Sequence, residues 1–306
     1  MLSAIIMKVS GLSLEQFLNR YLFYPMEIYE AQWELSPEKL TAGGMGLSLY
    51  PMSLVKIAQL LLKEGSYNGS QLISKEYLKM AVTQQIIKQD DINNPDSEFS
   101  GNGYGYQFHI GKDGYYRMDG AFGQLCLMCP DKKKAVIVFS QYSKTEALLS
   151  LIYKHLLNDT ECCCAYIENT RPEKNAAAVD AVIPCSNFRL EDNILGIKYV
   201  EFLPSCNEYL VKLCYAEYTD TIRFSLLQET SGKMNFLKDL QVHKQEYYCE
   251  AVFNEALILK IYFIETPYVA VYRFSFYGNK LRFEFSINVS FTLKDFAVDG
   301  FLVEKR

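Results

Sequence analysis

Two serine–lysine pairs in this sequence have a spacing that could support nucleophilic catalysis, Ser36-Pro-Glu-Lys39 and Ser53-Leu-Val-Lys56. A serine hydroxyl attacks an acyl carbon only when a nearby lysine or tyrosine accepts its proton and backbone N–H groups hold the developing oxyanion. Two such pairs are the number that chance gives for this content of serine and lysine. Ser53 follows Pro51 at a predicted helix start, where its hydroxyl would cap a free N–H, and Ser36 precedes a proline in a loop. We expect neither serine to be a nucleophile.

The other chemically active residue types are scattered. His109, His155 and His243 have no spacing typical of a metal site or of a Ser-His-Asp arrangement. Tyr277-Gly278-Asn279 is predicted to form a hairpin turn, because glycine and asparagine tolerate positive φ. The nine cysteines lack zinc-type spacing, and an odd number argues against a disulfide framework, so reduced thiols are expected. We predict no metal and no cofactor.

Residues 119–130, DGAFGQLCLMCP, place two glycines just before an apolar run. Glycine at such a position admits a close backbone neighbour, because it has no Cβ. One interpretation is structural: Gly120 and Gly123 relieve crowding where a strand twists past a helix. The alternative is that these positions line a binding cleft.

Composition limits the class of protein. A chain of 306 residues is long enough for two domains, and 49% hydrophobic with 22% charged residues is typical of a folded globular protein. The net charge of -5 disfavours a nucleic-acid partner, since the only compact basic run is Lys132-Lys133-Lys134. No apolar stretch is long enough to span a membrane. The sequence as written is therefore expected to be soluble and cytoplasmic.

The periodicity changes along the chain and predicts an α+β fold. Apolar residues at helical spacing end at Gly11, a capping box joins Ser13 to Gln16, and a further helix runs from Pro51 towards Gly65. The remaining elements expected in the first half are a helix over 74–84, a polar loop over 85–103, three antiparallel strands within 104–141, of which residues 115–129 form one, and a helix over 144–157.

The second half is predicted to be a separate all-β domain. Residues 158–182 lose all periodicity and indicate a linker. Beyond them, alternating apolar residues predict about eight short strands, which suggest a small barrel or sandwich over 183–306. The expected organisation is therefore residues 1–157, a linker over 158–182 and a β domain over 183–306.

Four blocks of the first half carry a resemblance to a known family. They are LSAIIMKVSGLSLEQFLNRYLFYPM, AGGMGLSLYPMSLVKIAQLLLKEGSYNGSQLIS, GYGYQFHI and DGAFGQLCLMCPDKKKAVIVFS. In this order they resemble the second half of the serine β-lactamase and penicillin-binding-protein-like hydrolases, especially the class C and esterase-like branch. The β-rich second half looks like the accessory β-domain of bacterial members. The resemblance implies a truncated β-lactamase-like domain followed by that β-domain.

The resemblance implies an acyl-transfer cleft. Family members hydrolyse small-molecule or peptide acyl esters and amides with a serine in Ser-x-x-Lys, a tyrosine in Tyr-x-Asn and a third, glycine-bearing strand motif. DGAFGQ stands where the third motif belongs, which makes Asp119, Gly120 and Ala121 the substrate-cleft candidates. Met118-Asp119-Gly120 replaces the family's Lys-Thr-Gly or His-x-Gly, so recognition of a β-lactam carboxylate is not expected.

The matched blocks begin after the family's nucleophile region. The resemblance therefore predicts no catalytic residue in this chain, and an inactive fragment of a serine hydrolase. Two alternatives stay open. The chain could be one half of a split hydrolase whose N-terminal half is a separate polypeptide, or a non-catalytic protein that binds a ligand or a peptide.

Overall fold

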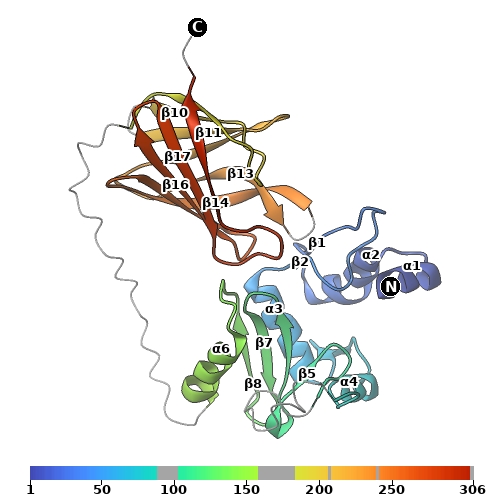
Figure 1. The fold of residues 1–306 in the computed structure, drawn as a ribbon. Coiled ribbons are helices and arrows are strands. Elements are labelled where there is room, and N and C mark those ends of the chain that lie inside the picture. Colours follow the sequence, from blue (N-terminus) through green and yellow to red (C-terminus); the bar gives the residue numbers. More distant parts are fainter. Residues whose placement is uncertain (88–102, 158–182, 206–207, 239–240, 304–306) are drawn as a thin grey trace. The chain divides into compact units, whose positions relative to one another are not determined.

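The computed structural model describes residues 1–87, 103–157, 183–205, 208–238 and 241–303. The chain divides into two compact units, residues 1–164 and 165–306. The predicted linker over 158–182 and most of the predicted loop over 85–103 lie outside the described residues, so the proposed domain boundaries stay a prediction. Figure 1 shows the elements of both units.

The helices of the first unit begin and end where local signals predict. Gly11, in the left-handed region at φ 73°, ends the first helix, and Ser13 and Gln16 form the predicted capping box of the second. Ser74 caps the fourth by accepting a hydrogen bond from the Tyr77 N–H. The helices are α1 (Leu2–Ser10), α2 (Leu14–Leu18), α3 (Pro51–Leu62), α4 (Lys75–Ala81) and α6 (Thr145–Ile152), with shorter helical turns at Asn19–Phe23, Tyr24–Met26, Lys112–Gly114 and Tyr153–Leu157.

Strands of the first unit form three antiparallel sheets. Two are two-stranded, and the third has four strands in the order β5-β6-β7-β8. The bounds are β1 (Gln32–Trp33), β2 (Leu47–Ser48), β3 (Ser66–Tyr67), β4 (Ser70–Gln71), β5 (His109–Ile110), β6 (Tyr116–Gly120), β7 (Gln124–Cys129) and β8 (Lys134–Val138).

The prediction of one continuous strand over residues 115–129 is wrong. The chain reverses at residues 121–123, because Phe122 and Gly123 both adopt positive φ, 63° and 85°. β6 and β7 therefore form a hairpin. The first strand expected from residue 104 onward is limited to His109–Ile110, because Gln107 also has positive φ and interrupts the extended backbone.

The four-stranded sheet is covered on both faces, and this explains its apolar strands. α3 packs on one face through Ala58 and Leu61, against residues that include Tyr116 and Met128. α6 packs on the other through Leu149 and Ile152, against the alternate residues of β7 (Figure 1). This arrangement fixes the β6–β7 hairpin at one end of a rigid layer.

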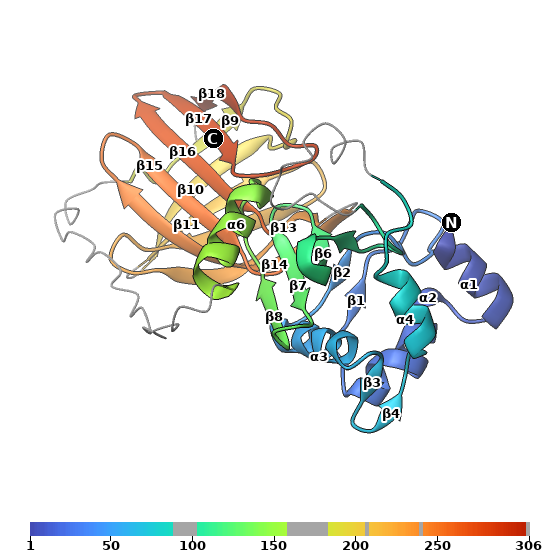
Figure 2. The same ribbon diagram turned by 90° about the horizontal axis from the view of Figure 1, so that it is seen from below.

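The second unit is one ten-stranded antiparallel sheet in the order β12-β11-β10-β9-β18-β17-β16-β15-β14-β13. The sheet curls into a nearly closed barrel (Figure 2), which agrees with the predicted barrel but has more strands than expected. The strands are β9 (Asn187–Leu190), β10 (Tyr199–Ser205), β11 (Glu208–Cys214), β12 (Thr219–Phe224), β13 (Thr230–Lys238), β14 (Gln241–Phe253), β15 (Leu257–Phe263), β16 (Val269–Tyr277), β17 (Lys280–Ile287) and β18 (Phe296–Leu302).

Aromatic side chains fill the inside of this sheet. Phe283 lies 5.1 Å, centroid to centroid, from Phe274 and 6.1 Å from Tyr272, and all three are fully buried. The predicted hairpin turn is confirmed, since Tyr277 pairs with Lys280 and Gly278 between them has φ 60°. Tyr277-Gly278-Asn279 therefore forms part of a hairpin turn. This turn belongs to the β domain, which has its own hydrophobic core.

Candidate functional site

The outer edge of β6 changes character along its length. β5 pairs with its first half, His109 opposite Arg117 and Ile110 opposite Tyr116. Residues 118–120 pair with β7 on one side, and no other strand among the described residues faces them on the other. An open strand edge presents main-chain N–H and C=O groups to which an extended chain can bond. The predicted cleft residues lie here: Asp119 is half-buried, whereas Gly120 and Ala121 are exposed.

A charged cluster stands beside this edge. The Arg117 Nε donates to both carboxylate oxygens of Asp119, at 3.1 and 3.0 Å. The His109 Nε2 lies 3.7 Å from the same carboxylate, and the His109 ring meets Tyr104 edge-on at 5.0 Å. Residues 117 and 119 share a face because strand side chains alternate, and His109 joins them through its register opposite Arg117. The cluster therefore places a fixed positive charge beside the carboxylate of Asp119.

The β6–β7 turn is fastened to residues 140–142. The Tyr142 N–H donates to the Phe122 carbonyl at 3.0 Å, and the Ser140 hydroxyl donates to the Gly123 carbonyl at 2.8 Å. Gln124 completes the clamp, because its Nε2 donates to the Ser140 carbonyl at 2.7 Å and its Oε1 accepts from the Ser140 N–H at 3.3 Å. The rim of the candidate site is therefore held rigidly.

Both glycines of this hairpin have a packing reason. A Cβ on Gly123 would lie 2.5 Å from the Tyr142 carbonyl oxygen and would also overlap the Ser140 Oγ. A Cβ on Gly120 would lie 2.8 Å from the Gln124 Cβ on the facing strand. The crowding interpretation accounts for them, although the neighbours are a loop and a strand and not a helix. A cleft role for Asp119, Gly120 and Ala121 stays a prediction.

Ser53 and Lys56 do not act as a pair. The Ser53 hydroxyl, 6% exposed, donates to the Glu30 Oε1, while the Lys56 Nζ donates to the carbonyls of Met26 and Glu27 at 3.0 and 2.8 Å. The hydrogen bond from Ser53 is the main cause that lowers the pKa of Glu30. The predicted capping role is wrong, since Tyr50 is the N-cap and its side chain makes no capping bond. Both side chains fasten residues 26–30 to α3.

Ser36 and Lys39 belong to a tight turn. The Lys39 N–H donates to the Ser36 carbonyl at 2.8 Å, and Lys39 has φ 60°. The Ser36 Oγ accepts from the Leu40 N–H at 3.3 Å. The same hydroxyl lowers the pKa of Glu38 by hydrogen bonding. The structure thus gives this serine a turn-forming role.

The partners of Asp119 were not predicted from the sequence. The alternation of Arg117 and Asp119 was a usable signal, but the approach of His109 required the strand register. His155 and His243 lie elsewhere, in Tyr153–Leu157 and on β14. Within the described ranges, no group of three or more His, Cys, Asp or Glu residues could hold a metal ion. None of the described cysteines forms a disulfide, and Cys162, Cys163, Cys164 and Cys206 lie outside the described residues.

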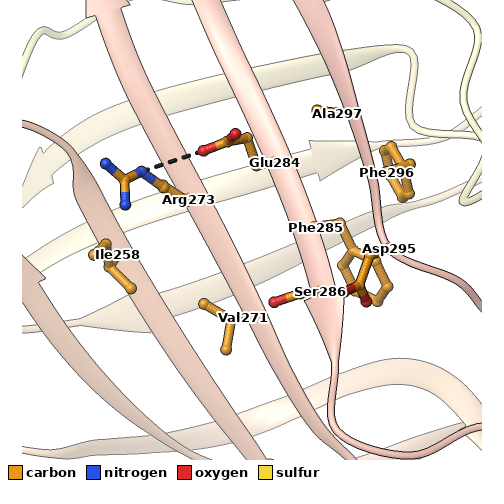
Figure 3. Close-up of a pocket in the computed structure, with 9 residues that line it drawn as sticks. All are labelled: Ile258, Val271, Arg273, Glu284, Phe285, Ser286, Asp295, Phe296 and Ala297. Carbon is orange, nitrogen blue, oxygen red and sulfur yellow. Dashed lines mark ion pairs between the residues drawn. The ribbon is translucent and has the colours of Figure 1, made fainter.

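The β domain has a groove of about 550 Å³ on the outer face of its sheet (Figure 3). An ion pair between Arg273 Nε and Glu284 Oε2, 3.2 Å apart, crosses it. The groove lies outside the barrel, because Arg273 and Glu284 alternate along their strands with the buried Tyr272, Phe274, Phe283 and Phe285. Its lining residues are Ile258, Val271, Arg273, Glu284, Phe285, Ser286, Asp295, Phe296 and Ala297.

None of the described helices has the length and apolar character needed to cross a membrane.

Neither a protein-family model nor a curated protein sequence matches this chain. Among solved structures, a protein described as a 6-aminohexanoate-dimer hydrolase from Bacillus anthracis is similar at 21% identity and a TM-score of 0.41, over 50% of this chain and 40% of that one. An octameric penicillin-binding protein homologue from Pyrococcus abyssi is similar at 17% identity and a TM-score of 0.40, over 97% of this chain and 62% of that one. The REP1-NXSQ fatty acid transporter is similar at 12% identity and a TM-score of 0.31, over 40% of this chain and 97% of that one. The chain thus spans less than two thirds of the length of the first two, and likenesses this weak assign it no function.

Proposed function

We propose that residues 1–157 provide the substrate-binding wall of an acyl-hydrolase cleft and that this chain does not form an acyl-enzyme by itself. The observation that carries the proposal is the open β6 edge at residues 118–120. This edge coincides with the segment that resembles the glycine-bearing strand motif of serine β-lactamase-like hydrolases. An extended acyl substrate would add to β6 as a further strand through main-chain hydrogen bonds.

The chemistry of the edge supports binding more than bond cleavage. Acyl transfer needs a hydroxyl whose proton a neighbouring base accepts. Ser53 instead donates to a carboxylate, and Lys56 donates to two backbone carbonyls. Ser36 closes a turn. Neither Ser-x-x-Lys sequence of this chain therefore offers an activated nucleophile.

Asp119 determines the preferred charge of the substrate. A carboxylate on the substrate would approach the Asp119 carboxylate, and like charges close together repel each other. Arg117 offsets this repulsion in part, because its Nε already contacts both oxygens of Asp119. We therefore propose that the wall accepts neutral or amine-bearing acyl groups in preference to anionic ones.

Labelling with a fluorophosphonate probe tests the catalytic part of the proposal. The native chain should show no covalent adduct by intact mass, as should Ser53→Ala and Ser36→Ala. A heat-denatured sample sets the background, and an active serine hydrolase sets the positive signal. One native-dependent adduct that maps to a single serine would overturn the proposal.

Peptide binding tests the wall itself. An acetyl-capped peptide should protect the amides of residues 118–121 from hydrogen exchange, and the matched succinyl-capped peptide should protect them less. Asp119→Asn should reduce the difference between the two caps, because it removes the repelling charge. Equal protection by both caps in the native chain would refute the charge preference, and no protection by either would refute the wall.

The second candidate, one half of a split hydrolase, is favoured by β8. Residues 135–138 are apolar, and they pack alternately with the α3 cluster and the α6 cluster. Such coverage on both faces is typical of an interior strand, yet β8 pairs only with β7 among the described residues. A separate chain could supply the missing strand.

Co-expression with the product of the preceding reading frame tests this candidate. A split enzyme should co-purify as a stoichiometric complex, and Val136→Pro should weaken the complex, because proline removes a strand donor and fits strand interiors poorly. Lys63→Ala, on the exposed end of α3, is the control. A monomeric chain that captures no partner would count against the split enzyme.

A further inference from the structure

The ten-stranded sheet of the β domain ends at β12 and β13, which follow one another in the chain. Among the described residues these two strands share no backbone ladder; side chains connect them. The Thr230 hydroxyl donates to the Arg223 carbonyl at 2.7 Å, and the Arg223 N–H donates to the Tyr247 hydroxyl at 3.0 Å. The Asn235 N–H and Nδ2 both donate to the Asp220 Oδ1, at 3.1 and 2.9 Å. We call this junction the β12–β13 seam.

The hydrogen bond between Tyr247 and Arg223 depends on close packing at β13. Tyr247 belongs to β14, so its hydroxyl has to pass β13 to reach Arg223 on β12. Gly232 on β13 makes room for it, since a Cβ there would lie 2.6 Å from the Tyr247 hydroxyl oxygen. A side chain at residue 232 would therefore displace one of the bonds that close the seam.

Asp220 contributes a carboxylate to the hydrogen bonds of the seam. Asp220 is 5% exposed, and its Oδ2 has no hydrogen-bond partner within the described part of the chain. A buried carboxylate oxygen without a donor costs free energy, and burial penalises an ionised carboxylate more than a neutral carboxylic acid. At this position, burying a neutral carboxyl therefore costs less free energy than burying an ionised one.

The surroundings of Asp220 also favour the neutral carboxyl. Burial raises the pKa of its carboxyl, and the two hydrogen bonds from Asn235 together with the charge of Lys244 only partly oppose that shift. Tyrosines face Asp220 from three other places: Tyr215 and Tyr218 around the β11–β12 turn, Tyr272 on β16 and Tyr247 on β14. Burial raises the pKa of all four, and the charge of Asp220 adds to the increase.

We propose that the β12–β13 seam is a pH-sensitive opening of the β domain and that Asp220 is its latch. The seam is closed while the Asp220 carboxyl carries a proton, and it loosens when the carboxyl ionises, because opening brings the charge into water. Within the described residues, β12 shares a backbone ladder with β11 alone. An outward movement of β12 that keeps the β11–β12 and β10–β11 ladders breaks only the side-chain bonds of the seam, whereas opening the described sheet anywhere else breaks a backbone ladder.

The direction of the pH effect follows from linkage. An open seam exposes Asp220, whose pKa is then near the ordinary value of 3.8. Between that value and the raised value of the closed state, opening releases one proton, so the opening constant rises by at most about tenfold per pH unit. Above the raised value it levels off. The closed seam is therefore most stable at and below the ordinary pKa of 3.8 and weakest above the raised pKa.

Hydrogen exchange of the full chain from pH 4 to pH 8 tests the proposal, with rates corrected for intrinsic exchange. Protection of residues 219–224 and 230–238 should fall as pH rises, while protection of residues 257–287 stays constant. Asp220→Asn should abolish this dependence, because its amide keeps the acceptor oxygen and adds a donor without a charge. Thr230→Val should lower protection of the seam at every pH and leave the slope unchanged, which separates a weaker seam from a pH-sensitive one.

Three results would overturn the proposal: a flat pH profile in the native chain, an unchanged slope in Asp220→Asn, or an equal loss of protection in residues 257–287, which would indicate global unfolding. Far-UV circular dichroism at each pH establishes that the domain stays folded. If Asp220→Asn does not fold, the contrast in the native chain between the seam strands and residues 257–287, together with the slope of Thr230→Val, decides the outcome.

Discussion

The two units of this chain reach stability in different ways. The β domain encloses its core in one sheet, so that every second residue of β15, from Leu257 to Phe263, is buried. The first unit divides its buried residues among separate clusters around short elements, and side-chain bonds join those elements. Ser53 with Glu30, and Gln124 with Ser140, are two of these ties.

Because of this difference, the two units tolerate irregular structure in different places. The aromatic core of the nearly closed barrel leaves little room for unsatisfied groups, and within the described residues the exceptions are the Oδ1 of Asn187 on β9 and the Oδ2 of Asp220 at the seam. The first unit can hold an open strand edge at residues 118–120, because the clamp at residues 140–142 and the layers of α3 and α6 fix the hairpin independently of that edge. Function is therefore expected at a rim in the first unit and at a seam in the second.

Removing one aromatic ring from the β core should have the largest effect. Phe283→Ala should lower the free energy of unfolding of the β domain by about 3 to 5 kcal/mol, because Phe283 is fully buried among Phe274, Tyr272 and Phe296. Urea denaturation measures the change. Tyr248→Ala, on the outer face of β14, is the control and should cost about 1 kcal/mol or less. Equal losses in both variants would contradict a core confined to the inside of the sheet.

A substitution in the clamp should have an intermediate effect. Gly123→Ala should destabilise the first unit by about 2 to 4 kcal/mol, because its Cβ would overlap residues 140–142 in a conformation with positive φ. Gly114→Ala is a matched control: it also has positive φ, 73°, but nothing lies within 4 Å of its Cβ. It should cost about 1 kcal/mol. Thermal unfolding and hydrogen exchange of residues 116–129 measure both, and similar losses would show that close approach is unimportant.

Removing the hydrogen bond between Ser53 and Glu30, which we call the Ser53–Glu30 tie, should have the smallest effect of the three on stability. Ser53→Ala should cost about 1 to 2 kcal/mol near pH 7, because it removes a hydrogen bond to a carboxylate. The lowered pKa of Glu30 means that its stabilisation is present above the ordinary value of 4.5 and is lost as pH falls through the lowered value. The pH dependence of unfolding below 4.5 should therefore be shallower in Ser53→Ala.

Glu30→Gln distinguishes charge from hydrogen bonding at this tie. The amide keeps an acceptor for Ser53 but cannot ionise, so this variant should also flatten the acid limb while losing less stability at pH 7 than Ser53→Ala. If the free energy of unfolding of both variants falls at acid pH as steeply as that of the native chain, the ionisation of Glu30 is not linked to its hydrogen bond with Ser53.

Local residues determined most of the element ends. Gly11, the Ser13–Gln16 capping box and the Gly278 turn act over a few residues, so the sequence suffices to predict them. Alternation over residues 257–263 and 281–287 likewise predicted strands with one buried face. The full number of strands in the β domain and their order were not predicted, because they depend on pairing between distant segments.

Tertiary structure decided the candidate sites. Residues 115–129 have the composition of one strand, and only the clamp to residues 140–142 shows why the chain reverses at Phe122 and Gly123. Ser53 bonds to Glu30, which is 23 residues away in the sequence. Asp220 on β12 bonds to Asn235 on β13, across the seam. Such partners are set by strand register and by the packing of distant segments, neither of which is written in the spacing of neighbouring residues. The sequence by itself therefore determined most of the element ends of this protein, and the fold decided where the chain reverses within residues 115–129 and which side chains meet.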